Sequence, residues 1–409
     1  MKITKLSLVA TLAISAAFAG GDIAPVEPVV EAPAVVAEAE ACNSATTVNS
    51  KAIAYYMTSD NKGTGDMFEA ENSSAGSAVI FDVNHKIFTG LSANFSAVGY
   101  VNFGDDIGVN DFEGHPNGAF INVANLTASY FDTTFIVGRQ LIDTPLVGGY
   151  DWLLAPGAFE AAVVMNQSIE GLTLVGGYLT KWRPNNSGNN WVDLTKIDEG
   201  NNWTAGAMYT MNDALSISAW YYNVDSGAAD ANNDKIPDND KIPDNVDKFT
   251  AIYGDAGYDF GMFNVAGQIT STDFNTAIDG LAYGLKAGAT FSGINLTAAV
   301  SNTSDNQGGY VGRDSMYTTS WNVQSSHVAV LNDDTLSWKV GASTEIAGFN
   351  AEASYAGYGD EGSELDVILG YDITDCISAG AVYSLTDYDV NVNTADADSV
   401  LELFATYQF

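Results

Sequence analysis

The chain ends with the stretch Val400-Leu-Glu-Leu-Phe-Ala-Thr-Tyr-Gln-Phe409, which decides the fold. Side chains alternate between the two faces of a β-strand. One face of this strand carries Glu402, Thr406 and Gln408, with Phe404 among them, and the other is formed by Leu401, Leu403, Ala405, Tyr407 and Phe409. Bacterial outer-membrane barrels close with such an amphipathic strand, whose aromatic residues lie at the membrane interface. A soluble β-sandwich or propeller is the alternative, but it would not need this terminal aromatic strand.

The beginning of the chain has the pattern of a secretory signal. Lys2 and Lys5 precede an apolar run that ends in the small-x-small motif Ala17-Phe18-Ala19. The run is too short to span a bilayer as a helix. We therefore expect residues 1–19 to be a signal peptide, residues 20–48 to be a flexible periplasmic arm rich in Ala, Pro and Glu, and residues 49–409 to be a barrel.

Composition agrees with a barrel and limits the partners. Hydrophobic residues make up 46% of the chain and charged residues 16%, yet no long apolar run predicts a transmembrane helix. Lys and Arg number 15 and Asp and Glu 51, so the net charge is −36. This charge disfavours nucleic-acid binding, which needs basic patches. It would attract cations, or the acidic residues could serve only to keep surface loops solvated.

The spacing of the strands predicts their number. Alternation is clearest over 281–292 and 336–346, and weak over 134–140 and 249–258. Short connections alternate with longer loops rich in Asp, Asn and Gly, an asymmetry typical of short periplasmic turns and long extracellular loops. We count 18 antiparallel strands, with 16 as the alternative, and place both termini in the periplasm.

One segment carries a family resemblance. Gly138-Arg139-Gln140 is followed by Thr144-Pro145 and then by Asp151-Trp152-Leu-Leu-Ala-Pro156-Gly-Ala-Phe159-Glu160. This resembles the third-loop region of OprD-type outer-membrane channels, and the chain is similar to the major porins of campylobacter-type bacteria. The resemblance implies an 18-strand barrel, usually a homotrimer, that passes small polar solutes and cations. Trp152 and Ala161 depart from the family pattern, which usually has Arg and Gly there.

Loop 141–159 is the most apolar of the long loops. An extracellular loop of this kind should bury its apolar side chains. It could do so by folding into the lumen as a constriction, which we favour, or by packing at a subunit contact.

Charged residues on the polar faces of strands are the candidate pore residues. A charge that faces lipid is costly near the bilayer midplane, so such side chains should face the lumen, where they set ion selectivity. The alternative is that they pair with one another across strands. The candidates for the pore wall or constriction are Arg139, Asp151, Glu160, Lys181, Arg183, Lys286, Lys339, Glu345, Asp366 and Asp372.

Two further features suggest bound ions or cross-links. Loop 225–247 repeats the sequence Asp-Lys-Ile-Pro-Asp-Asn, so calcium could bind there through carboxylates, although a solvated acidic loop is the alternative. Its candidate ligands are Asp234, Asp238, Asp240 and Asp244. Cys42 precedes the first strand and Cys376 lies at the last periplasmic turn, so a disulfide between them is expected in an oxidising periplasm.

The sequence gives little support for catalysis. His85, His115 and His327 are scattered and match no metal or nucleophile spacing. No cofactor is expected to be required. We interpret the chain as an outer-membrane porin for passive diffusion of ions and small polar solutes, with a preference for cations. A substrate-selective OprD-type channel and a surface adhesin or structural protein remain alternatives.

Overall fold

The structure is a computed structural model. It describes residues 45–61, 65–112, 117–149, 154–183, 194–197, 201–212, 214–225, 248–273, 279–304, 316–322, 335–359, 362–388 and 397–409. The expected signal peptide and residues 20–44 of the expected arm lie outside these ranges.

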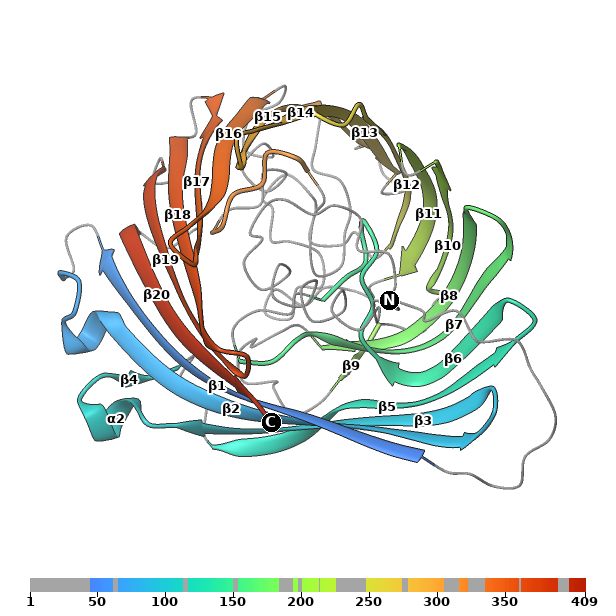
Figure 1. The fold of residues 1–409 in the computed structure, drawn as a ribbon, viewed down its shortest axis with the longest axis horizontal. Coiled ribbons are helices and arrows are strands. Elements are labelled where there is room, and N and C mark those ends of the chain that lie inside the picture. Colours follow the sequence, from blue (N-terminus) through green and yellow to red (C-terminus); the bar gives the residue numbers. More distant parts are fainter. Residues whose placement is uncertain are drawn as a thin grey trace, which may run out of the picture.

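The described chain forms one sheet that closes into a barrel, and its pairings are antiparallel except for the short one between β2 and β4 (Figure 1). The sheet contains 20 strands, of which β4 (Asn110–Asp111) and β9 (Thr195–Lys196) have two residues each, so 18 strands build the wall. These are β1 (Ala45–Asn61), β2 (Ser73–Phe88), β3 (Leu91–Asn102), β5 (Gly118–Tyr130), β6 (Thr133–Gln140), β7 (Ala158–Ile169), β8 (Leu172–Arg183), β10 (Trp203–Met211), β11 (Leu215–Asp225), β12 (Lys248–Asp259), β13 (Phe263–Asp273), β14 (Asp279–Phe291), β15 (Ile294–Ser304), β16 (Thr335–Ile346), β17 (Phe349–Tyr358), β18 (Gly362–Thr374), β19 (Ile377–Tyr388) and β20 (Ala397–Gln408). The count of 18 is confirmed, and the weakly alternating stretches 134–140 and 249–258 are both strands.

Closure joins the two ends of the barrel sequence. β20 pairs antiparallel with β1, and the pairing runs from Lys51 opposite Gln408 to Asn61 opposite Ala397. The terminal residue continues this ladder, because Ser50 N donates to Phe409 O at 3.1 Å and Phe409 N donates to Ser50 O at 2.9 Å. The amphipathic last strand therefore closes the barrel, as the sequence predicts.

The two faces of the wall differ as the period of two requires. On β14, Leu285 is 64% exposed on the outer face, whereas its neighbours Gly284 and Lys286 point to the inner face. On β16, Leu336, Trp338 and Val340 are exposed outside in the same way. An apolar outer surface and a polar inner surface are what a barrel in lipid needs.

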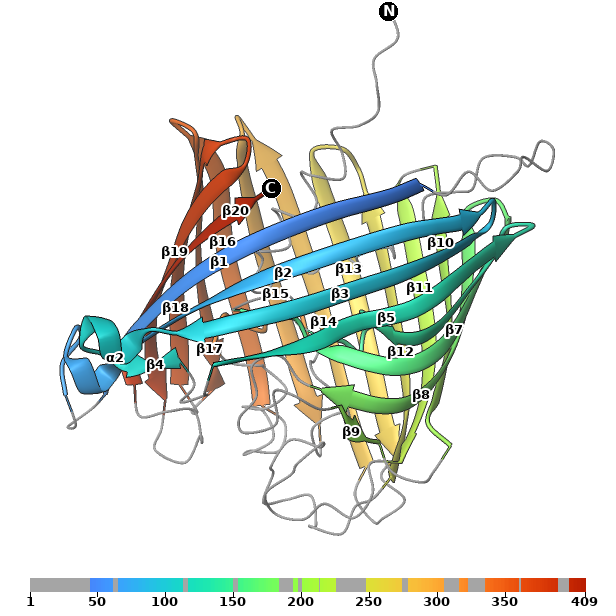
Figure 2. The same cartoon turned by 90° about the horizontal axis from the view of Figure 1, so that it is seen from below.

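The strands are joined by tight turns at one end and by longer segments at the other (Figure 2). The turn from β14 to β15 has Ser292 at φ 52° and Gly293 at φ 82°. Positive φ at both central residues is the type I′ geometry, whose twist suits a two-residue hairpin. β1 begins at Ala45, upstream of the expected start of the barrel at residue 49.

Two short helical turns accompany the strands, η1 (Ala70–Asn72) and α2 (Gly104–Ile107). Neither of these described helices is long and apolar enough to cross a membrane.

Candidate functional site

Two chain segments lie inside the ring of strands, and together they define the candidate site (Figure 1). The first comprises the described parts of the connection between β6 and β7, residues 141–149 and 154–157. The second is residues 316–322, from the long connection between β15 and β16. Both pack against side chains that the strands direct into the lumen.

Residues 141–149 pack against the wall formed by β7, β8, β11 and β12. Leu146 and Val147 join a buried cluster that includes Phe159, Trp182 and Tyr222. Leu146 N donates to Tyr222 Oη at 3.3 Å, which fixes the segment to β11. Burial of these apolar groups stabilises the segment at this position.

Residues 154–157 contact the neighbouring part of the wall. Leu154 and Ala155 are buried in a second cluster with Tyr55 of β1 and Phe112. The two described parts of the loop therefore contact two different stretches of the inner wall. These described residues contact the inner side of the wall. Folding of the whole loop 141–159 into the lumen, which we favoured over a subunit contact, stays a prediction.

Arg183 contacts this loop and does not line an open pore. Its side chain is 1% exposed. Its Nη2 donates to Pro156 O at 3.0 Å and also contacts Asn122 Oδ1, and its Cζ lies 4.0 Å from the centre of the Phe120 ring. We expected Arg183 to line the pore, but it links the end of β8 to β5 and to the loop.

Residues 316–322 are held by carboxylates on the inner wall. Glu364 and Asp366 of β18 are 0% and 1% exposed. Glu364 Oε1 accepts hydrogen bonds from Asn322 N at 2.8 Å and from Asn322 Nδ2 at 3.3 Å. Asp366 Oδ2 accepts one from Trp321 N at 3.1 Å. Three hydrogen bonds to carboxylate oxygens of one wall strand therefore dock the segment.

Other strands complete the anchoring of the same segment. Trp321 Nε1 donates to Glu402 Oε1 of β20 at 2.8 Å. Tyr358 Oη of β17 donates to Thr318 O at 3.0 Å. Lys339 Nζ of β16 donates to Thr319 O at 2.8 Å.

The expected pore residues Lys286, Lys339 and Asp366 therefore do face the lumen, but two of them hold a segment inside it. Lys286 Nζ lies 5.6 Å from the centre of the Tyr317 ring. Lys286, Lys339 and Tyr317 line a recess in the inner wall, together with Glu352 and Ser354 of β17. No pattern within residues 316–322 points to the lumen, and the inward carboxylates of β18 and β20 are the one available signal.

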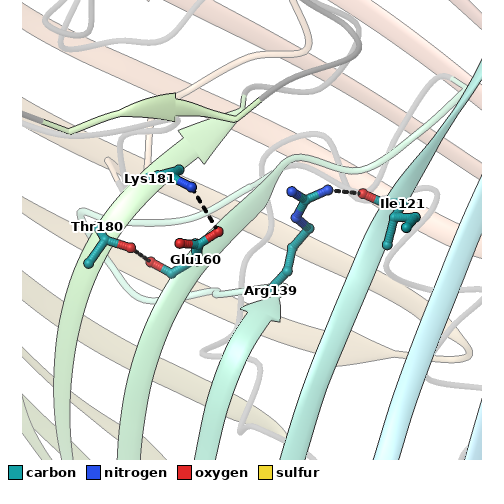
Figure 3. Close-up of polar contacts among 5 residues, drawn as sticks. All are labelled: Ile121, Arg139, Glu160, Thr180 and Lys181. Atoms are coloured by element: carbon teal, nitrogen blue, oxygen red, sulfur yellow. Dashed lines mark hydrogen bonds and ion pairs between the residues drawn. The ribbon is translucent and has the colours of Figure 1, made fainter.

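Arg139, Glu160 and Lys181 form a row at the ends of β6, β7 and β8 (Figure 3). Lys181 Nζ and Glu160 Oε2 are 3.2 Å apart, and Arg139 Nη1 donates to Ile121 O. The register pairs Arg139 with Glu160 and Glu160 with Lys181.

The alternation of each strand assigns this row to the outer face. Phe135 and Val137, which share a face with Arg139, are 49% and 58% exposed. Phe159, which alternates with Glu160, is 0% exposed in the inner cluster. On β8 a bulge at Thr180 resets the alternation, so Lys181 lies opposite Glu160. We expected Arg139, Glu160 and Lys181 to line the pore or its constriction. For Lys181 the bulge explains why counting by twos along β8 fails.

The remaining candidates are spread out. Glu345 and Asp372 are exposed near the turn ends of β16 and β18. Asp151, Cys42 and the four aspartates expected to bind calcium lie outside the described residues. In the described part of the chain no group of three His, Cys, Asp or Glu side chains could hold a metal ion. His85 contacts Thr46 Oγ1 at 2.8 Å, and the other two histidines are not described.

Comparisons with known proteins bear directly on this geometry. Residues 103–227 match the family described as outer membrane porin, OprD family. The fold is a porin fold. No curated protein sequence matches the chain.

Solved structures of similar fold include several from Pseudomonas. OccK8 (OprE) of Pseudomonas aeruginosa has 15% identity and a TM-score of 0.66, covering 89% of this chain and 98% of that one. OpdK of the same species, solved with vanillate, has 14% identity and a TM-score of 0.67, with 89% and 98% covered. A BenF-like porin from Pseudomonas fluorescens Pf-5 has 14% identity and a TM-score of 0.66, also with 89% and 98% covered.

The apolar outer face, the closed barrel and the family match place the protein in the outer membrane. The proteins that it resembles are porins, not enzymes. The resemblance to campylobacter-type porins stays a prediction.

Proposed function

We propose that the protein is a porin through which ions and small polar solutes diffuse passively, with a preference for cations. The observation that carries the proposal is the charge of the inner wall. Its carboxylates include the partly exposed Asp255 and Glu352, and also Glu364, Asp366 and Glu402, which are buried against residues 316–322. The net charge of the chain is −36. Walls and rings of carboxylates favour cations over anions.

Reversal potential in a salt gradient tests this proposal. The purified protein is inserted into a planar bilayer between two concentrations of potassium chloride. We expect stepwise channels and a reversal potential displaced toward the value for potassium. A displacement toward the value for chloride would overturn the cation preference, while the absence of steps would favour an adhesin or a structural protein.

A substrate-selective channel is the second candidate, and one observation favours it. Two of the described segments lie in the lumen, and a recess between residues 316–322 and the wall combines Lys286 and Lys339 with Glu352 and the Tyr317 ring. Mixed charge and an aromatic face can orient a small polar solute. Flux into proteoliposomes distinguishes the two functions, because a selective site saturates with solute concentration and free diffusion does not.

Assembly and ion binding are proposed on weaker grounds. A homotrimer is proposed on the family resemblance and would be seen by native mass spectrometry. Calcium binding by Asp234, Asp238, Asp240 and Asp244 is proposed on the acidic repeat. Calorimetry that shows no heat when calcium is added would refute the calcium site.

A further inference from the structure

A row of charged side chains crosses four neighbouring strands at the loop end of the barrel wall. The register pairs Arg139 of β6 with Glu160 of β7, Glu160 with Lys181 of β8, and Lys181 with Lys196 of β9. Cross-strand partners share a face of a sheet, so all four lie on the outer face. The row holds three cations and one anion in a chain with only 15 basic residues.

The outer face changes character at this row. Moving toward the row, β6 presents Phe135 and then Val137, which are 49% and 58% exposed. β8 presents Tyr178, which pairs with Trp203 of β10, and these rings are 45% and 40% exposed. Aromatic residues mark the boundary between acyl chains and headgroups. The charges that follow them therefore lie at headgroup level.

We propose that this row binds the phosphate groups of a glycolipid in the outer leaflet. Ammonium and guanidinium groups are the natural partners of phosphate. The strands below supply an apolar surface for the acyl chains of the same molecule. The three basic side chains of the row attract an anionic lipid. The rest of the chain is strongly acidic and would repel such a lipid, so binding should be confined to the row.

The row has an internal control, since Glu160 opposes the binding that its neighbours favour. The Lys181–Glu160 pair is partly exposed, at 41% and 37%, so neither charge is committed to a buried network. Removing the acid should strengthen phosphate binding, and removing the lysines should weaken it. A merely structural role for the row would not give opposite signs.

Native mass spectrometry of the purified barrel tests the proposal. The protein in detergent is titrated with bisphosphorylated lipid A and, separately, with its dephosphorylated form carrying the same acyl chains. We expect the wild type to retain the phosphorylated lipid at least tenfold better. The double variant Lys181→Gln/Lys196→Gln should lose about fivefold for each lysine, and Glu160→Gln should gain.

The matched control is Lys86→Gln. Lys86 lies near the turn end of β2, at the opposite end of the barrel wall from the charged row, so retention should be unchanged. Heat-modifiable gel mobility verifies that every variant is folded. Equal retention of the two lipids by the wild type, or equal loss in Lys86→Gln and the double variant, would overturn the proposal.

Discussion

The carboxylates that hold residues 316–322 offer the sharpest test of how the lumen is narrowed. The double variant Glu364→Ala/Asp366→Ala removes the acceptors of three hydrogen bonds, which come from Asn322 N, Asn322 Nδ2 and Trp321 N. Hydrogen bonds to charged groups contribute about 1.5–3 kcal/mol each. The loss is therefore roughly 4.5–9 kcal/mol if the three bonds are additive, and less if they are coupled.

A fraction of this loss is enough to change the channel. About 1.4 kcal/mol shifts an equilibrium tenfold, so the segment should leave its docked position for a measurable share of the time. We expect higher single-channel conductance and greater current noise in planar bilayers. Glu364→Gln keeps an acceptor oxygen but removes the charge, and should give an intermediate result.

Glu345→Ala is the matched control. Glu345 is a carboxylate on the inner face of β16, near the turn end and away from residues 316–322. Its removal changes the charge of the wall without releasing the segment, so ion preference should respond more than conductance. Unchanged conductance and noise in a folded Glu364→Ala/Asp366→Ala protein would refute the anchoring role.

Three other outcomes follow from the geometry. Deleting Phe409 removes two backbone hydrogen bonds to Ser50, worth about 1–3 kcal/mol together; the folded fraction on heat-modifiable gels should fall, and an unaltered fraction would contradict the role of the seam. Leu285→Arg puts a charge on the outer face and should cost about 2–4 kcal/mol near the midplane; urea unfolding in lipid vesicles measures this, and no loss would mean that the faces are assigned wrongly. Gln408 N donates to Cys376 O at 2.8 Å, which ties the Cys376 turn to the seam beside β1. A Cys42–Cys376 bridge should therefore form and change gel mobility on reduction; two alkylatable thiols without reductant would exclude it.

The barrel could be predicted from the sequence because its signal is repeated along the chain. Alternation over 281–292 and 336–346 fixed the faces of those strands, and Lys286 and Lys339 were correctly directed inward. Residues 249–258 alternated poorly, since Tyr253 and Phe249 fill the inner cluster with apolar groups. Packing against a lumen segment thus erased the polar inner face on which the pattern depends.

The contents of the lumen could be predicted only in part. Loop 141–159 was recognisable from its own apolar residues, but residues 316–322 are polar and are held by partners far away in the sequence, such as Glu402. The bulge at Thr180 moved Lys181 to the other face, and a single extra residue of this kind leaves no mark in the alternation. Arg183 looked like a wall residue because its partners, Phe120 and Pro156, come from separate segments.

The pairing of β1 with β20 also limits when the barrel can form. Ser50 cannot meet Phe409 until nearly the whole chain has been made and exported, so closure is a contact of very high sequence separation. Until then both strands are open edges, and open edges recruit other chains. The protein must therefore reach the membrane with its first and last strands protected, and an assembly factor that shields either edge would act on the closure of the barrel.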